Sequence, residues 1–160
     1  MSNLIALEGF FIYPSQPKIV AQTISDTVRD LQNHAPQRNY KSWESLNIGG
    51  AIIFCEICKA IRSAKSIIGD ITTLNFNVLF ELGYALGLGK PVLPIRDSSY
   101  ERDKKLFEEL GIFDTLGYQD FRNSSDLTKI VTTKELNPRS TNILHSGGSP
   151  LRFATAHFGP

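Results

Sequence analysis

The chain has 160 residues, of which 41% are hydrophobic and 21% are charged, as is typical of one ordinary globular domain rather than a disordered chain. Its 17 basic and 16 acidic residues give a net charge of +1, which offers no bulk argument for a nucleic-acid or membrane partner. The sequence shows no signal peptide and no apolar run of membrane-spanning length, so we expect a cytoplasmic protein, and its two cysteines provide no disulfide framework.

Strand-like and helix-like segments alternate along the first 133 residues. Short apolar or β-branched runs bounded by turn residues predict strands, and apolar residues three or four positions apart predict helices. The predicted strands are 8–13, a short one within 39–47, 65–72, 90–95 and 117–121. The predicted helices are 18–34, 49–64, 77–89, 102–110 and 124–133. This alternation is typical of βαβ units, so we expect an α/β domain over residues 1–135, with four or five parallel strands between two layers of helices.

The last residues, 136–160, differ from this pattern. They contain Pro, Gly and Ser throughout and show no sustained period. We expect an extension or a linker there, or the start of a further domain.

Ligands of such sheets bind beyond the carboxyl ends of the strands, where the topology changes direction. Tyr13 and Ser15 follow the first predicted strand, as candidates to stack on a ring and to bind a phosphate, or as parts of a plain Pro-rich turn. Trp43 is a candidate pocket wall or an ordinary core residue. Arg96 and Asp97 follow the strand at 90–95 and are candidates for phosphate or ribose contacts, with surface pairing as the alternative.

The segment from Asp70 to Glu81 concentrates polar residues between two apolar strands. Asn75 is either the N-cap of the next helix or a ligand contact. In that helix the residues on the predicted core face are Val78, Leu82, Ala85 and Gly89, and those on the neighbouring stripe are Asn77, Glu81, Tyr84 and Leu88. Glu81 is therefore either a solvated acid of the first turns or a carboxylate that faces a pocket. Gly83, Gly87 and Gly89 predict a slim helix that packs closely on the sheet.

The stretch "GDITTLNFNVLFELGYALGLGKPVLPI" resembles a signature shared by nucleoside 2-deoxyribosyltransferases and the related bacterial Toll/interleukin-receptor-like (TIR-like) nucleotide-cleaving domains. The signature is an Asp after an apolar strand, an Asn- or Asp-rich loop, and then "ELGYA" and "GKPV". The similarity is continuous over residues 65–97 and weaker over 8–133. It implies a flavodoxin-like three-layer domain with a four- or five-stranded parallel sheet.

The resemblance also implies a reaction, because the Glu of "ELGYA" is the nucleophile in the transferases and the carboxylate that cleaves the nicotinamide–ribose bond of NAD in the TIR-like enzymes. Glu81 occupies that position. The transferases carry a second acid six residues earlier, where this chain has Asn75, and this departure favours NAD(P) as the substrate that is cleaved. We expect no cofactor and no metal in the reaction. The residues implied to bind substrate are Tyr13, Ser15, Trp43, Asp70, Asn75, Asn77 and Tyr84.

Two other functions remain open from the sequence: nucleoside 2-deoxyribosyl transfer, and a nucleotide-sensing or oligomerising module without catalysis. The resemblance further implies a role in bacterial anti-phage defence, with a homo-oligomer, a signal nucleotide or an activating domain or protein outside this chain switching on the activity. Cys55 and Cys58 fall within a predicted helix, which favours buried apolar cysteines over a redox or metal motif.

Overall fold

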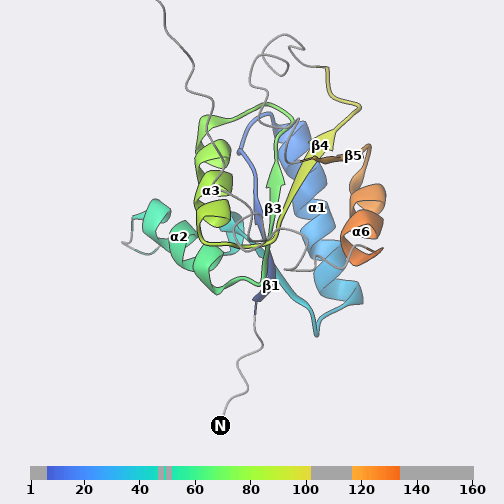
Figure 1. Cartoon of the computed structure of the whole chain (residues 1–160). Coiled ribbons are helices and arrows are strands. Elements are labelled where there is room, and N and C mark those ends of the chain that lie inside the picture. Colours follow the sequence, from blue (N-terminus) through green and yellow to red (C-terminus); the bar gives the residue numbers. More distant parts are fainter. Residues whose placement is uncertain (1–6, 47–48, 50–51, 102–116, 134–160) are drawn as a thin grey trace, which may run out of the picture.

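The computed structural model describes residues 7–46, 49, 52–101 and 117–133, and these form a parallel sheet between two layers of helices (Figure 1). The strands within these residues are β1 (Leu7–Ile12), β2 (Asn39–Ser42), β3 (Ser66–Asp70), β4 (Val92–Asp97) and β5 (Gln119–Phe121). The helices are α1 (Lys18–His34), the 3₁₀ turn η1 (Trp43–Ser45), α2 (Ile53–Ser63), α3 (Phe76–Gly87) and α6 (Ser124–Thr133). The expected α/β class and the five-stranded parallel sheet are confirmed.

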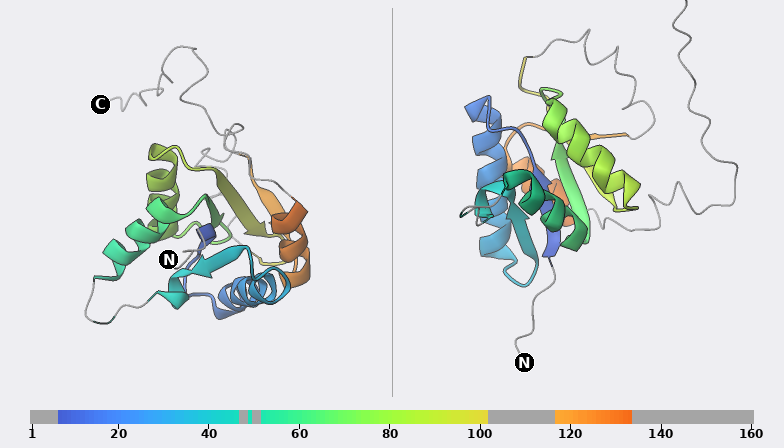
Figure 2. Two further views of the ribbon diagram at one scale, coloured as in Figure 1. Left: turned by 90° about the horizontal axis from the view of Figure 1, so that it is seen from below. Right: turned by 90° about the vertical axis from the view of Figure 1, so that its left-hand side faces the viewer.

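The two faces of the sheet carry different helices (Figure 2). Phe10 and Ile67 point into a core shared with α2 and α3, whereas the next residues, Phe11 and Ile68, point into a core shared with α1 and α6. This alternation is the period of a strand with both faces covered. It explains why β3 is buried along its whole length.

The strand order β2-β1-β3-β4-β5 places a change of direction in the middle of the sheet. From β1 the chain moves outward to β2 and then returns to pair β3 on the opposite side of β1. The segments that leave the carboxyl ends of β1 and β3 therefore diverge and open a crevice between them.

The sequence predicts most of the described elements to within a few residues, and α1 and α6 agree at both ends. The helix predicted at 49–64 begins later, as α2 at Ile53. The helix predicted at 102–110 and the extension at 136–160 lie outside the described residues. Within the part of the chain that the structure describes, no helix is long and apolar enough to cross a membrane.

The glycines of α3 do not have the packing role predicted for them. A Cβ atom at Gly83 or Gly87 would meet nothing within 4 Å, so neither residue lets the helix approach the sheet. Gly89 lies after the helix, is exposed rather than in the core, and terminates α3 with a positive φ of 68° and a bond from its N–H to the Leu86 carbonyl. The close approach occurs at Gly69 of β3, where a Cβ would collide with the Leu82 side chain.

Candidate active site

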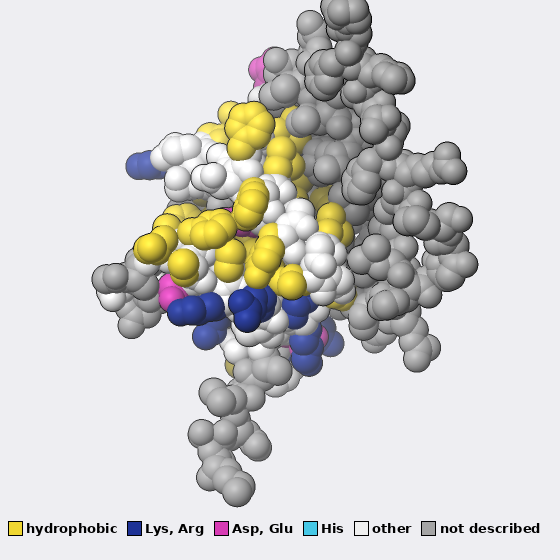
Figure 3. All heavy atoms as spheres, turned by 60° about the vertical axis from the view of Figure 1, so that its left-hand side comes forward, with side chains coloured by type: hydrophobic (Ala, Val, Ile, Leu, Met, Phe, Trp, Pro, Cys, Tyr) yellow, Lys and Arg dark blue, Asp and Glu magenta, His cyan; other side chains and the backbone are white. Residues whose placement is uncertain are grey.

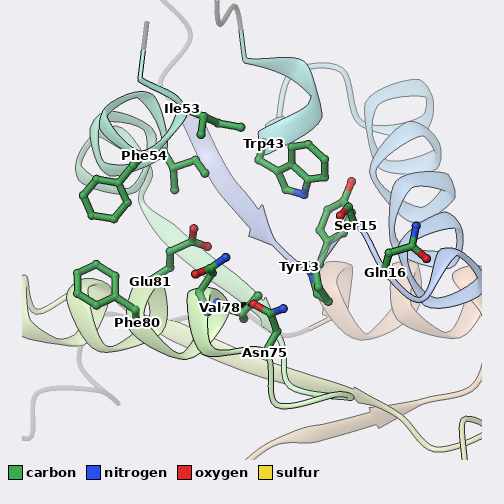
Figure 4. Close-up of a pocket in the computed structure, with 13 residues that line it drawn as sticks. Tyr13, Ser15, Gln16, Trp43, Ile53, Phe54, Asn75, Val78, Phe80 and Glu81 are labelled. Carbon is green, nitrogen blue, oxygen red and sulfur yellow. Dashed lines mark hydrogen bonds between the residues drawn. The ribbon is translucent and has the colours of Figure 1, made fainter.

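A pocket of about 590 Å³ opens at the crevice between the carboxyl ends of β1 and β3 (Figure 4). Its volume is within the range of small-molecule sites. Five segments supply the walls: the turn after β1, η1, the first turns of α2, the loop before α3, and the first turns of α3. The lining residues are Tyr13, Pro14, Ser15, Gln16, Trp43, Ile53, Phe54, Ile57, Asn75, Asn77, Val78, Phe80 and Glu81.

Glu81 lies on the floor of this pocket, with only 9% of its surface exposed. No hydrogen bond or ion pair to its carboxyl group is formed by any residue in the described ranges. Burial alone raises the pKa of this carboxyl from 4.5 to about 7, because the ionised form loses hydration without gaining a partner. A buried acid with a perturbed pKa in a pocket is a candidate for catalysis.

Asn75 and Asn77 form the rim of the pocket at the start of α3. The Asn75 side chain accepts hydrogen bonds from the backbone N–H groups of Asn77 and Val78, at 3.0 and 3.4 Å. Asn75 is therefore the N-cap of α3, and it also lines the pocket. Because the cap fixes the start of the helix, it also fixes where Glu81 enters the pocket.

Tyr13 and Trp43 form an aromatic wall opposite α3, with ring centroids 5.9 Å apart and planes tilted by 56°. Burial raises the pKa of Tyr13 to about 12, so its hydroxyl remains protonated. The Trp43 indole nitrogen is buried and has no hydrogen-bond partner within the described residues. Such an unpaired buried donor is uncommon in folded proteins.

Six of the eight predicted site residues line the pocket, and Asp70 and Tyr84 do not. The Asp70 side chain is 1% exposed and accepts hydrogen bonds from the backbone N–H and the hydroxyl of Thr72. Burial raises the pKa of Asp70 to about 6. Its contacts make Asp70 a residue that shapes the loop behind the site. Tyr84 lies three residues after Glu81, which carries it away from the mouth of the pocket, and it packs on the core between α2 and α3.

Arg96 also lies outside the pocket. It forms an ion pair with Asp120, as in the alternative to phosphate or ribose binding given for it above. Its guanidinium forms two hydrogen bonds with the Asp120 carboxylate and stacks over the Tyr118 ring, 4.1 Å from the centroid. Asp97 is buried and accepts hydrogen bonds from Ser99.

The two cysteines are not the buried pair that we expected, since Cys55 is exposed and Cys58 only partly buried. Among the described residues no group of three or more His, Cys, Asp or Glu side chains could hold a metal ion.

The contribution of α2 to the pocket was not predicted from the sequence. Ile53, Phe54 and Ile57 belong to a helix far from Glu81 in the sequence, and periodicity identified only the face that packs on the sheet. A local signal was present at Phe54, an aromatic residue placed off the core stripe of its helix. Phe80 carried the same signal in α3, because it lies off the predicted core face of that helix, and in the structure it is 56% exposed.

Comparisons with known proteins support the fold. A solved structure described as a conserved protein from Enterococcus faecalis V583 matches with a TM-score of 0.55 and 12% identity, over 79% of this chain and 98% of that chain. The structure of the Clostridium botulinum CMP N-glycosidase BcmB matches with a TM-score of 0.48 and 12% identity, over 79% of this chain and 100% of that chain. No family model matches the sequence, and no curated protein matches it significantly. At 12% identity, the likeness to the Enterococcus protein concerns the fold alone.

Proposed function

We propose that this domain cleaves N-glycosidic bonds of nucleotides, with Glu81 as the catalytic carboxylate and NAD(P) as the substrate. The observation that carries the proposal is Glu81 itself, a buried carboxylate without a partner among the described residues, on the floor of an open pocket. The sequence resemblance of residues 65–97 assigns the same residue to the same chemistry.

The reaction fits a lone carboxylate. When the bond between the ribose C1′ and the nicotinamide nitrogen breaks, its electron pair goes to the nitrogen and C1′ acquires oxocarbenium character. An ionised Glu81 near C1′ stabilises or captures this cation, and water then adds to C1′ with loss of a proton. The products are nicotinamide, ADP-ribose and a proton.

The absence of a second acid favours NAD(P) over a neutral nucleoside. Among the described residues that line the pocket, Glu81 is the only acid, and Asn75 stands where the transferases have theirs. The Asn75 side chain caps α3, and an amide cannot deliver a proton as a carboxyl group can. A neutral base needs protonation to leave, whereas nicotinamide departs from a cationic precursor as a neutral molecule.

The wider biological role rests on the resemblance. An effector of anti-phage defence that is activated by self-assembly, by a signal nucleotide or by a partner would keep this activity silent until infection. Nucleoside deoxyribosyl transfer and a non-catalytic sensing module are the competing functions, and each predicts a different product pattern.

The test is a chromatographic product analysis with NAD, NADP and 2′-deoxynucleosides, each with and without a second free base. The proposal predicts nicotinamide and ADP-ribose (or its 2′-phosphate) from the dinucleotides and no exchange of bases. Exchanged deoxynucleosides would identify a transferase. Binding of NAD without any product, unchanged in Glu81→Gln, would identify a sensing module and refute the catalytic role.

A further inference from the structure

The pocket has two chemically different ends, separated by Glu81 (Figure 4). On one side lie the polar groups of Ser15, Gln16 and Asn75, together with the aromatic wall of Tyr13 and Trp43. On the other side lie Ile53, Phe54 and Phe80, without a polar side chain among them. A ligand whose reactive carbon faces Glu81 would therefore meet polar groups beside an aromatic wall in one direction, and only apolar groups in the other.

Phe54 and Phe80 form the apolar end as a pair, which we call the aromatic ledge. Their ring centroids are 5.5 Å apart and their planes are tilted by 46°, and they come from different helices, α2 and α3. The two residues remain 46% and 56% exposed, so their contact leaves much apolar surface in water. Figure 3 shows hydrophobic side chains gathered on this face of the molecule. A planar ring that covers the ledge would remove this surface from water.

The charge at the pocket restricts which ring is suitable. Among the described residues that line the pocket, Glu81 is the only one with a charged side chain, and none is a Lys, Arg or His. A positively charged ring is attracted by an ionised Glu81 and by the electron-rich faces of the two phenylalanines. A neutral ring obtains only the stacking contribution.

We propose that the aromatic ledge of Phe54 and Phe80 binds the leaving group of the substrate and selects a cationic N-ribosylated heteroaromatic ring of the pyridinium class. The inference rests on the proposed function and adds residues that set the substrate's orientation. The ribose lies at Glu81, and the rest of the nucleotide extends toward Ser15, Gln16 and Asn75. Because the ledge is at the exposed mouth of the pocket, the neutral ring released by cleavage can leave before the sugar product does.

Binding of small probes tests the ledge independently of cleavage. The probes are 1-methylnicotinamide, which is a pyridinium cation, nicotinamide, which is neutral, and ribose 5-phosphate, which has no ring to stack. Their affinities are measured by calorimetry or NMR titration for the wild type and for Phe54→Ala, Phe80→Ala and Phe80→Leu. Phe76→Ala is the matched control, since Phe76 is 82% exposed on the same helix and does not line the pocket.

We expect the wild type to bind the cation more tightly than neutral nicotinamide at pH 8, where Glu81 is largely ionised. Phe54→Ala and Phe80→Ala should weaken binding of the cation by roughly five- to tenfold, the range of cation–π and stacking contacts. Phe80→Leu keeps an apolar side chain and should reduce the preference for the cation. Binding of ribose 5-phosphate should change by less than about twofold, and Phe76→Ala should resemble the wild type for every probe.

The inference is wrong if the wild type does not bind the cation, or if binding is unchanged in both alanine variants of the ledge. An equal loss in Phe76→Ala would assign the effect to the exposed face in general, as expected of a protein-docking surface, and would also overturn it. The proposed function fails separately. If Glu81→Gln cleaves substrate as fast as the wild type while binding of the cation still depends on Phe54 and Phe80, the ledge is a binding site and the catalytic assignment of Glu81 is wrong.

Discussion

The burial of Glu81 makes a quantitative prediction about stability. In the unfolded chain this carboxyl titrates near its ordinary pKa, and in the folded protein burial raises the pKa from 4.5 to about 7. The folded state therefore holds this proton more tightly, and the contribution of Glu81 to stability falls as the pH rises from about 4.5 to about 7. At about 1.4 kcal/mol per pKa unit, the ionised carboxylate destabilises the fold by about 3 kcal/mol above pH 7.

Glu81→Gln removes this titration while keeping a side chain of similar size. Denaturant unfolding of both proteins at pH 4.5 and pH 8 measures the effect, because contributions from other groups, Asp70 included, are common to both and largely cancel. We expect the variant to gain about 3 kcal/mol relative to the wild type between the two pH values. The control is Glu44→Gln, which removes an exposed carboxylate. A relative gain below about 1 kcal/mol for Glu81→Gln would show that Glu81 has a charge partner or is hydrated, and would refute the reasoning.

Three further predictions follow from the same geometry. The pH profile of kcat/KM for NAD should rise through an apparent pKa near 7, because the reaction needs ionised Glu81. The profile of kcat should show a lower pKa, because a bound cationic ring stabilises the ionised form of Glu81. Asn75→Ala should lower the free energy of unfolding by about 1 kcal/mol through loss of the helix cap, whereas Asn75→Asp, which can still cap, should not. Gly69→Ala should destabilise the protein by about 1 to 3 kcal/mol by colliding with Leu82, while Gly83→Ala, in an open helical position, should stabilise it by up to about 1 kcal/mol. Chemical denaturation checks both pairs, and equal effects at the two glycines would contradict the packing described here.

The sequence predicts the sheet and its helices well because their signals are local. A period of two residues identifies strands, a period of 3.6 identifies helices, and the alternation of the two leaves few arrangements for the chain. The rule that ligands bind beyond the carboxyl ends of strands located Tyr13 and Asn75, and the stripe beside the core face of α3 located Glu81. These inferences needed no knowledge of which helices are neighbours.

The remaining parts of the site depend on contacts between distant segments. Asp70 ends a strand buried on both faces, so its side chain is held inside by Thr72 rather than directed into the pocket. Phe54 reaches the pocket because α2 and α3 cover the same face of the sheet, which periodicity in either helix does not reveal. The packing role predicted for the glycines of α3 was wrong for the same reason. The helix approaches the sheet closely at Gly69, which belongs to strand β3 and not to the helix itself.

The most direct test of the central claim is nicotinamide release from NAD by the purified protein, measured over a series of protein concentrations beside Glu81→Gln. The account predicts release by the wild type and at least a hundredfold less by the variant, with specific activity rising with concentration if assembly activates the domain. Equal release by both proteins would remove Glu81 from the chemistry. Cleavage of 2′-deoxynucleosides by the same protein without any release of nicotinamide from NAD would contradict the assignment of NAD as the substrate.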